Sequence, residues 1–397
     1  MPKNWLMTRR RALGLGLASL AGMGVLAGGR AIHLSHQIQA LDDPERDFTV
    51  VGEASLRERA AAQGLIYGAA SGYDRLSSDA QFAARFTREC SIIVPEGELK
   101  WAALRPSLDK FDFTQADWLA EFARTHGMLF RGHTLVWNQA LPEWFKDTVN
   151  SHNAREILVK HIATVVGHYA GKIHSWDVVN EGIELKDGRS DGLRNTPWLQ
   201  FLGPNYIDIA FRAAAEADPQ ALLVYNDDGF TYDTREDEAK RVALLKMLER
   251  WKSQGTPVQA LGMEAHLRGD ETQLNPRKLK DFLRDVAALG LKILVTELDV
   301  KDNHLPKDTD VRDRIVAKVY EDFLSVMLEE PAVIGVLTWG LSDRYTWLSE
   351  PKYGGARDDG ASVRPLPLDA QLKRKLAWNA IARAFDNAPK RNVGSRH

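Results

Sequence analysis

The sequence predicts an α/β protein that folds as a single (β/α)8 TIM barrel, and three observations support this fold class. Short β-type runs alternate with helical patterns from about Leu56 to the C-terminus, and eight such units can be distinguished. Most of the β-type runs are continuously apolar, as parallel strands covered on both faces require. No Pro/Ser-rich linker or low-complexity tract marks a second domain.

Each strand candidate is a short apolar run bounded by polar residues or turn formers. In chain order the candidates are Leu65–Ala69, Ser91–Pro95, Phe130–Val136, Ser175–Val179, Leu222–Asn226, Ala260–Ala265, Ile293–Thr296 and Val333–Thr338. A doubly wound open sheet is the structural alternative, but it would normally carry a G-x-G-x-x-G loop after its first strand. The segment "IYGAASGYD" contains Gly68 and Gly72 without that pattern, so we prefer the barrel.

Several of the intervening helices carry start and stop signals. Thr114 and Thr234 are expected to cap two of them, and Pro276 is expected at the start of a third. A glycine follows each of these helices and is expected to end it. Three tryptophans with helical spacing are expected in the core: Trp118, Trp251 and Trp378.

The composition argues against several function classes. Hydrophobic residues make up 44% of the 397 residues and charged residues 27%, which is ordinary for a globular protein with a large core. The formal net charge of -2 does not suggest the concentrated basic surface that nucleic acid requires, so we expect no nucleic-acid partner. Cys90 is the only cysteine, so no intrachain disulfide or cysteine-based metal cluster can form.

The histidines do not show the spacing of a metal site. His161 and His168 lie in a helical pattern and are expected either at the surface or with hydrogen-bonded rings. No H-E-x-x-H or comparable motif is present. We therefore expect no metal ion and no cofactor.

The N-terminus resembles a twin-arginine export signal. Arg9–Arg11 precede an uncharged stretch, 12–29, that is rich in Ala, Gly and Leu. An uncleaved membrane anchor is the alternative, because this stretch is close to the roughly 20 residues that a spanning helix needs. We expect an exported protein that is periplasmic or secreted. The predicted divisions are a signal at 1–30, an extension at 31–54, the catalytic barrel at 55–390 and a tail at 391–397.

Polar or aromatic residues follow the apolar run at seven of the predicted strand ends. In chain order these segments are "VPEGELKW", "GHTLVWNQ", "WDVVNE", "VYNDD", "GMEAHL", "VTELDV" and "LTWGLSDRYTW". One Asp or Asn at a strand end often caps the next helix, but capping does not readily explain seven ends together. The C-terminal strand ends of a barrel meet at one face, where active sites of this fold lie. We therefore expect a site there.

Two of these strand ends finish with a glutamate, Glu181 and Glu297. Paired carboxylates are the minimum machinery for cleaving a glycosidic bond, with one as proton donor and the other as nucleophile or water activator. Asn180 could donate a hydrogen bond to a sugar hydroxyl. His266, held between Asp299 and Glu297, would orient the second carboxylate and stabilise its charge.

Aromatic residues lie beside the same strand ends. Flat apolar faces can stack on sugar rings while polar neighbours hold the hydroxyl groups. The tryptophans in such positions are Trp101, Trp137, Trp339 and Trp347. Covering the end of the barrel is the alternative role for each of them.

At these residues the chain resembles the endo-β-1,4-xylanases of glycoside hydrolase family 10. The segments "WDVVNE", "GHTLVW" and "VTELDV" resemble that family's acid/base, sugar-binding and nucleophile motifs. The likeness continues through "LVYND", "GMEAHL" and "LTWGLSDRYTW" and covers about Leu56 to Ala384. Three ordered motifs within a barrel-length frame make the resemblance specific.

The resemblance implies a retaining double displacement on xylan, with Glu181 as general acid/base and Glu297 as nucleophile. Residues implied to surround the attacked sugar are His133, Asn180 and His266. Residues implied to contact neighbouring xylose units are Glu96, Lys100, Trp137, Trp339 and Trp347. Residues expected to position the catalytic pair from the next layer of side chains are Asn226, Glu264 and Asp299.

The sequence departs from the family pattern at three positions. Gly97 follows Glu96 where an Asn is usual, and Asn138 follows Trp137 where a His is common. Both changes remove groups from the sugar-binding side. Glu264 stands where Gln is common, and if ionised it would raise the proton affinity of its neighbours and the pH optimum.

Two other functions remain open at this point. A barrel glycosidase that prefers short xylo-oligosaccharides or another β-glycan would fit Gly97 and Asn138. A non-catalytic carbohydrate-binding barrel is the alternative from a different class, and the intact glutamate pair argues against it. We expect a monomer with a polysaccharide or oligosaccharide partner and no membrane contact of the mature barrel.

Overall fold

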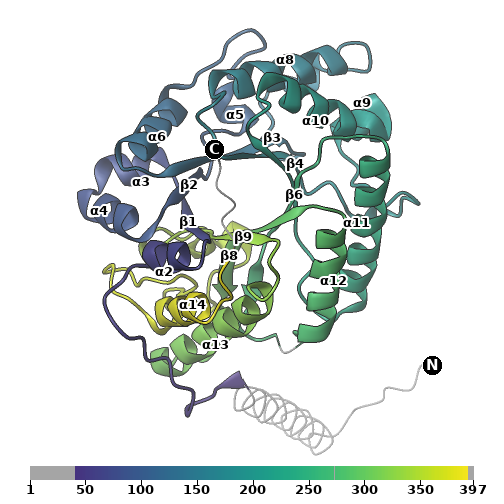
Figure 1. Cartoon of the computed structure of the whole chain (residues 1–397). Helices are drawn as coiled ribbons and strands as arrows, with labels where there is room; N and C mark the ends of the chain where they lie inside the picture. The colour runs from purple at the N-terminus through teal and green to yellow at the C-terminus, as the bar shows by residue number, and fades with distance from the viewer. Residues whose placement is uncertain (1–40, 272, 392–397) are drawn as a thin grey trace, which may run out of the picture.

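Eight parallel strands close into a barrel surrounded by helices (Figure 1) in the part of the chain that the computed structural model describes, residues 41–271 and 273–391. The strands pair in chain order. The pairing of the sixth barrel strand with the seventh, Ala260–Met263 with Lys292–Val295, completes the ring. The predicted (β/α)8 barrel is confirmed. The predicted export signal lies outside the described residues.

All eight predicted strands are present with small changes at their ends. They are β1 (Ile66–Ser71), β2 (Ile92–Pro95), β3 (Leu129–Val136), β4 (Ser175–Asn180), β5 (Leu222–Asp227), β6 (Ala260–Met263), β8 (Lys292–Lys301) and β9 (Val333–Thr338), with β7 (His266–Arg268) as a short extra strand. β8 is longer than predicted because β6 and then β7 pair with successive parts of it.

The sixth predicted strand is interrupted, which the sequence did not indicate. Met263 pairs with Val295, whereas His266 pairs with Asp299, so the register shifts by one residue across the interruption. Such a shift re-aims the side chains beside it. Glu264 lies in this interruption.

The helices alternate with the strands around the outside of the barrel (Figure 1). They are α2 (Leu56–Ala62), α3 (Tyr73–Ser78), α4 (Ala80–Glu89), α5 (Trp101–Leu104), α6 (Thr114–Thr125), α7 (Phe145–Thr148), α8 (Ala154–His168), α9 (Pro197–Leu202), α10 (Tyr206–Ala217), α11 (Arg235–Ser253), α12 (Pro276–Ala288), α13 (Thr309–Met327) and α14 (Leu376–Asp386). Short 3-10 turns lie at Leu185–Asp187, Gly203–Asn205, Asp343–Tyr345, Trp347–Ser349 and Pro351–Tyr353.

Two of the three predicted helix starts are confirmed. Thr234 caps α11 by accepting a hydrogen bond from the backbone N–H of Asp237, and Pro276 is the first residue of α12. The prediction that Thr114 caps α6 is wrong, because Thr114 is the first residue of the helix and its backbone N–H donates to the side chain of Asp112. Asp112, two positions before Thr114, thus accepts from an N–H group that the helix leaves unpaired.

The core has two parts. Side chains from the strands fill the barrel interior, including Val94, Val224 and Leu294, while a larger cluster lies between the strands and the helices. Trp251 and Trp378 are buried in this outer layer, as predicted. Trp118 packs against this cluster but is only partly buried, and its ring stacks on Phe122 along α6 at a centroid distance of 5.4 Å.

The N-terminal end of the described chain is tied to helix α13. Arg46 donates a hydrogen bond to Glu321 on α13, and Asp42 pairs with Arg314 on the same helix. Within the described residues, no helix combines the length and the apolar character needed to cross a membrane.

The prediction for His161 is wrong. Its ring is fully buried, and neither ring nitrogen has a hydrogen-bond partner among the described residues. The ring stacks on Trp101 at a centroid distance of 3.6 Å. Burial, together with the nearby charge of Arg105, holds the pKa of His161 well below its usual value. The other histidine of this pair, His168, follows the expectation, since its Nε2 lies 2.7 Å from Asp117.

We therefore expect His161→Phe to reduce the loss of stability on acidification. The unfolded chain binds a proton on His161 below pH 6.5, whereas the folded protein resists it, so the folded state loses stability as the pH falls. Over the first 1.5 pH units below 6.5, the free energy of unfolding falls by at most about 2 kcal/mol for this reason. Denaturant unfolding at a series of pH values measures it, with exposed His152→Phe as the control. Equal pH dependence in wild type and His161→Phe would contradict the assignment.

Candidate active site

A cavity of about 780 Å³ opens at the C-terminal ends of the strands. The residues that line it are Glu96, Gly97, Lys100, His133, Trp137, Gln139, Ala140, Asn180, Glu181, Asp228, Glu264, His266, Glu297, Lys301, Trp339, Trp347 and Tyr353. The structure thus brings together both predicted catalytic glutamates and all eight predicted substrate-binding residues. Of the three predicted supporting residues, Glu264 lines the cavity, while Asn226 and Asp299 are fully buried beside it.

Glu181 follows β4 directly in a strained backbone conformation. Its φ of 49° lies in the left-handed region, which residues other than glycine adopt infrequently. Its backbone N–H donates to the carbonyl of Asn226 at 2.9 Å, and its own carbonyl accepts from Arg194 Nε at 2.6 Å. Hydrogen bonds on both sides hold the residue in this conformation, as is common at functional sites.

The surroundings of the Glu181 carboxyl group favour its protonated form. Burial raises the pKa of Glu181 to about 7, and the negative charges of Asp227 and Glu297 act in the same direction. The guanidinium of Arg194, 3.5 Å away, opposes this rise without cancelling it. Glu181 therefore holds a proton up to near-neutral pH.

Glu297, within β8, is held in the opposite state. Burial alone would raise its pKa, but the hydrogen bond from His266 and the charges of His133, His266 and Lys100 keep it below the usual value. Nε2 of His266 lies 3.3 Å from one carboxylate oxygen, and Nδ1 of His133 lies 3.9 Å from the other. The two cavity glutamates therefore have opposite preferred protonation states.

His266 is oriented by a chain of hydrogen bonds, as the sequence predicted. Its Nδ1 donates to Asp299 at 3.0 Å while its Nε2 faces Glu297. The second oxygen of Asp299 accepts from Trp347 Nε1 at 2.7 Å. Burial alone would lower the pKa of His266, but the carboxylates of Asp299 and Glu297 raise it to about 10. The ring is therefore a fixed positive charge beside Glu297.

Asn226 joins both sides of the site from the end of β5. Its Nδ2 lies 2.8 Å from Asn180 and 3.0 Å from Glu297, and its Oδ1 accepts from Thr296 at 2.7 Å. Gly262 on β6 makes room for this side chain, because a Cβ there would lie 2.1 Å from Asn226 Oδ1. Any larger residue at Gly262 would displace the amide.

His133 is supported by groups that the sequence reasoning did not assign. Its Nδ1 donates to Asp177 at 3.1 Å, and Asp177 also pairs with Arg131, all of them buried. β3 and β4 place His133 opposite Asp177 in register. Asp177 lies inside "WDVVNE", so an acidic residue within a buried strand was a visible signal.

Three of the four predicted tryptophans line the cavity. Lys100 Nζ lies 4.8 Å from the ring centre of Trp137 and 6.0 Å from that of Trp339. The prediction for Trp101 is wrong, because α5 turns its ring into the core, where Nε1 donates to the carbonyl of Leu135. Trp101 therefore packs against His161 instead of reaching the cavity.

Several residues in or beside the cavity were missed from sequence. Tyr353 packs against Trp347 at a centroid distance of 5.0 Å and is 43% exposed, and Lys301 Nζ lies 5.6 Å from the ring centre of Trp347. Tyr353 and Arg194 come from long loops without periodicity, so no sequence signal marked them. Asp228 was visible in "VYNDD" but received no role.

The departure at Gly97 leaves open space. A Cβ at Gly97 would meet no atom within 4 Å, and the residue lines the cavity next to Glu96. Glu96 itself pairs with Arg75. Asn138 is partly buried, and its Oδ1 has no hydrogen-bond partner among the described residues.

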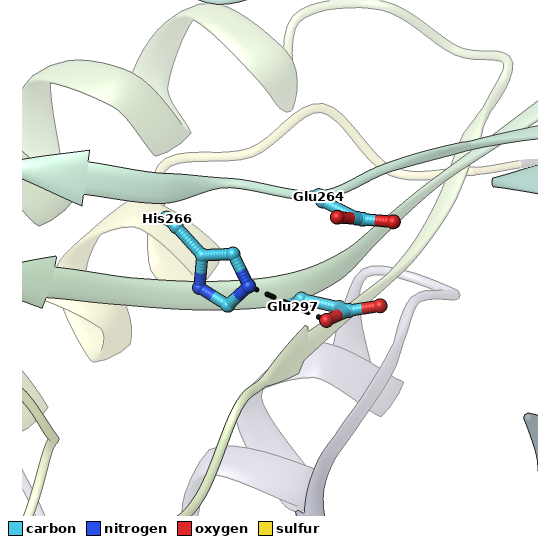
Figure 2. Close-up of side chains that lie close together, drawn as sticks. All are labelled: Glu264, His266 and Glu297. Carbon is cyan, nitrogen blue, oxygen red and sulfur yellow. Dashed lines mark ion pairs between the residues drawn. The ribbon is translucent and has the colours of Figure 1, made fainter. Parts of the chain in front are cut away.

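Glu264, His266 and Glu297 lie close enough to resemble a metal site. Their ligand atoms fall within 4.8 Å of one another, and Figure 2 shows the two carboxyl groups side by side with the His266 ring next to them. Hydrogen bonds account for the cluster, because both nitrogens of His266 face carboxylates and both glutamates lie beside the amide of Asn226. We assign no metal to these residues, and the absence of a metal requirement stays a prediction.

Comparisons with known proteins agree on one family. A family model described as glycosyl hydrolase family 10 matches residues 55–384. A β-1,4-xylanase of Dictyoglomus thermophilum is 35% identical over 265 residues, covering 64% of this chain and 72% of that protein. Endo-1,4-β-xylanase 3 of Hypocrea jecorina is 31% identical over 376 residues, covering 92% and 97%. The crystal structure of xylanase 10B from Thermotoga maritima has a TM-score of 0.76 at 32% identity, covering 84% and 98%.

Proposed function

The chain belongs to glycosyl hydrolase family 10, and on this premise we propose that it is a retaining endo-β-1,4-xylanase that cleaves internal bonds of xylan. One observation supports this proposal above the others. Glu181, directly after β4, and Glu297, within β8, line the same cavity, and their surroundings favour opposite protonation states. A retaining glycosidase needs one protonated and one ionised carboxyl group at the start of its cycle.

In the first half of the reaction, Glu297 attacks the anomeric carbon while Glu181 gives its proton to the departing oxygen. A bond forms between the sugar and the Glu297 carboxylate, and the glycosidic bond breaks. His266 and Asn226 fix the attacking carboxylate in place. The partial positive charge that develops on the sugar ring is stabilised by the adjacent carboxylate charge.

In the second half, Glu181 takes a proton from water, which attacks the anomeric carbon and releases Glu297. Once Glu297 is bonded to the sugar, its negative charge no longer raises the pKa of Glu181. The pKa of Glu181 therefore falls, which suits its change from acid to base. Two inversions at the same carbon return the original configuration.

The remaining cavity residues are assigned to substrate binding. His133, Asn180 and His266 would surround the attacked sugar. The residues assigned to neighbouring sugars are Glu96, Lys100, Trp137, Trp339 and Trp347. Trp and Lys side chains together offer apolar faces and hydrogen-bond donors, as sugar rings require.

We also propose that residues 1–30 act as a twin-arginine export signal, so that the mature enzyme is periplasmic or secreted. The basic run Arg9–Arg11 before an uncharged stretch supports this, as does a chain with a single cysteine. Residues 31–54 would form an extension, 55–390 the catalytic barrel and 391–397 a tail. We keep the expectation of a monomer.

Rates on different glycans test the substrate assignment. We expect faster release of reducing ends from polymeric xylan than from soluble cellulose, with internal cleavage shown by an early fall in xylan viscosity. Faster cleavage of cellulose would overturn the xylan assignment. Activity on short aryl xylosides without a fall in viscosity would indicate an enzyme for oligosaccharides.

The protonation states predict the pH profile. We expect kcat/KM to fall as the pH rises through about 7, because Glu181, with a pKa of about 7, loses the proton it must donate. On the acid side the rate falls as Glu297 takes up a proton, below the usual range for a carboxyl group.

Arg194→Met should move the alkaline limb of this profile to higher pH, because Arg194 lowers the pKa of Glu181. An alkaline limb that stays at the same pH, or moves to lower pH, would contradict the role of Arg194.

The open space at Gly97 predicts that an added amide will strengthen substrate binding. We expect Gly97→Asn to lower KM for xylo-oligosaccharides by about 3-fold to 10-fold with little change in kcat, because one hydrogen bond is gained away from the bond that breaks. Gly97→Ala is the matched control, since it adds a side chain without a donor. Equal KM values for the two variants would contradict this expectation.

A further inference from the structure

One amide group beside the cavity is shared by three acceptors. Nδ2 of Asn226 lies 2.9 Å from Oε1 of Glu264 and 3.0 Å from Oε1 of Glu297. It also lies 2.8 Å from Oδ1 of Asn180. The hydroxyl of Thr296 donates to the amide oxygen and fixes the orientation of the group. A carboxamide carries two N–H bonds, so it cannot donate fully to all three acceptors.

Glu264 lies among other acidic groups and is 6% exposed. It faces Glu297 from β8, Glu181 after β4, and Asp227 and Asp228 at the end of β5. Burial is the largest influence on Glu264, and these four charges add to it, so its pKa is raised well above the usual value. Glu264 is thus surrounded by groups that disfavour a further negative charge.

Two of the nearby positive charges, His266 and Lys240, are paired with other carboxylates. His266 lies between Glu297 and Asp299, 3.3 and 3.0 Å from their oxygens. Nζ of Lys240 lies 2.8 Å from Asp227, the last residue of β5, and 2.6 Å from Asp228. No ion pair joins Glu264 to a cation in residues 41–271 and 273–391. Glu297 thus has a cationic partner, and Glu264 has only its share of the amide.

We propose that Glu264 carries a proton in the resting enzyme while Glu297 is ionised, and that this acid group donates a hydrogen bond to the sugar bound beside Glu297. The second oxygen of Glu264 has no hydrogen-bond partner among the described residues, and the residue lines the cavity. Glu264 is then a neutral donor that positions substrate without competing with the nucleophile. The sugar-binding half of this proposal rests on the proposed function, and the proton does not.

The proton on Glu264 is tested by infrared difference spectroscopy without substrate. At neutral pH we expect wild type minus Glu264→Gln to show the carbonyl stretch of a protonated carboxyl group. This band should disappear at alkaline pH as the carboxylate forms. A spectrum that shows a carboxylate at neutral pH would overturn the proposal. If Glu264→Gln does not fold, the difference spectrum of wild type minus Glu264→Leu gives the same answer.

Sugar binding is tested in a background that turns over xylan slowly and has no titrating group at position 181. Xylotriose affinity is measured by calorimetry against pH for Glu181→Gln and for Glu181→Gln/Glu264→Gln. We expect the affinity of the single variant to fall by about 10-fold as Glu264 ionises, and that of the double variant to change much less. Identical pH profiles would overturn the hydrogen bond to the sugar.

These outcomes separate this proposal from the proposed function. Failure of wild type to cleave xylan, or of the Glu181→Gln variant to bind xylotriose at any pH, overturns the function and the sugar contact together. The infrared result then still decides the proton on Glu264. Xylan cleavage with a carboxylate at Glu264 overturns this proposal and leaves the function intact.

Discussion

Glu297→Ala is expected to lower kcat on xylan by about 10⁴-fold to 10⁶-fold, because it removes the carboxylate that forms the bond to the sugar. The carboxylate of Glu297 is the group to which His266 and Asn226 are directed. Removing it leaves these groups around an empty position. Initial rates of reducing-sugar release measure the loss.

The fold should tolerate this change, which makes the activity loss interpretable. Glu297→Ala removes a negative charge that lies beside Glu264, so its effect on stability is partly compensated. Thermal unfolding checks this point. Glu143→Ala, at an exposed carboxyl group outside the cavity, is the control and should keep wild-type activity. A folded Glu297→Ala variant with a loss of less than 10²-fold would show that another group is the nucleophile.

Glu181→Ala is expected to give a loss that depends on the leaving group. On xylan the rate should fall by about 10²-fold to 10⁴-fold, because a sugar alkoxide cannot leave without a proton. On an aryl xylobioside with an acidic phenol, formation of the glycosyl-enzyme should be far less affected, because the phenolate leaves unprotonated. Steady-state and burst kinetics on both substrates measure the two losses.

The second half of the reaction should then limit turnover, since no base activates water. A small anion such as azide needs no base and fits the space that Ala leaves. We expect azide to raise turnover of the aryl xylobioside by Glu181→Ala and to give a β-configured glycosyl azide. Equal losses on both substrates with no response to azide would contradict the acid/base role of Glu181.

The fold and much of the site could be predicted from sequence because barrel geometry converts strand order into position. Apolar runs that end in polar residues mark the C-terminal strand ends, and a closed parallel barrel brings those ends together. Glu181 and Glu297 therefore meet in one cavity although they lie far apart in the chain. The chain from Asp299 through His266 to Glu297 followed from the same reasoning.

The errors arose where local pattern does not decide burial. His161 lies four residues after Ile157 and four before Val165, on the buried face of α8, but its polarity suggested a surface position. Trp101 follows a strand end, yet α5 turns it into the core. Such choices depend on which neighbours pack against a helix, which the sequence of that helix does not contain.

The loop residues had no sequence signal at all. Tyr353 and Arg194 reach the site from irregular segments, and a hydrogen bond or ring contact with a distant residue fixes each of them. The state of Glu264 also depended on structure, because it follows from the sharing of Asn226 and the charges around it. Neither the contacts of these loop residues nor the surroundings of Glu264 can be read from the spacing of residues along the chain.

The configuration of the first product tests the two-glutamate mechanism most directly. Proton NMR during hydrolysis of a xylo-oligosaccharide resolves the anomeric signals before mutarotation mixes them. Two displacements at one carbon, by Glu297 and then by water, predict that the new reducing end appears as the β-anomer. An α-anomer appearing first would mean a single inversion, and Glu297 would not be the nucleophile.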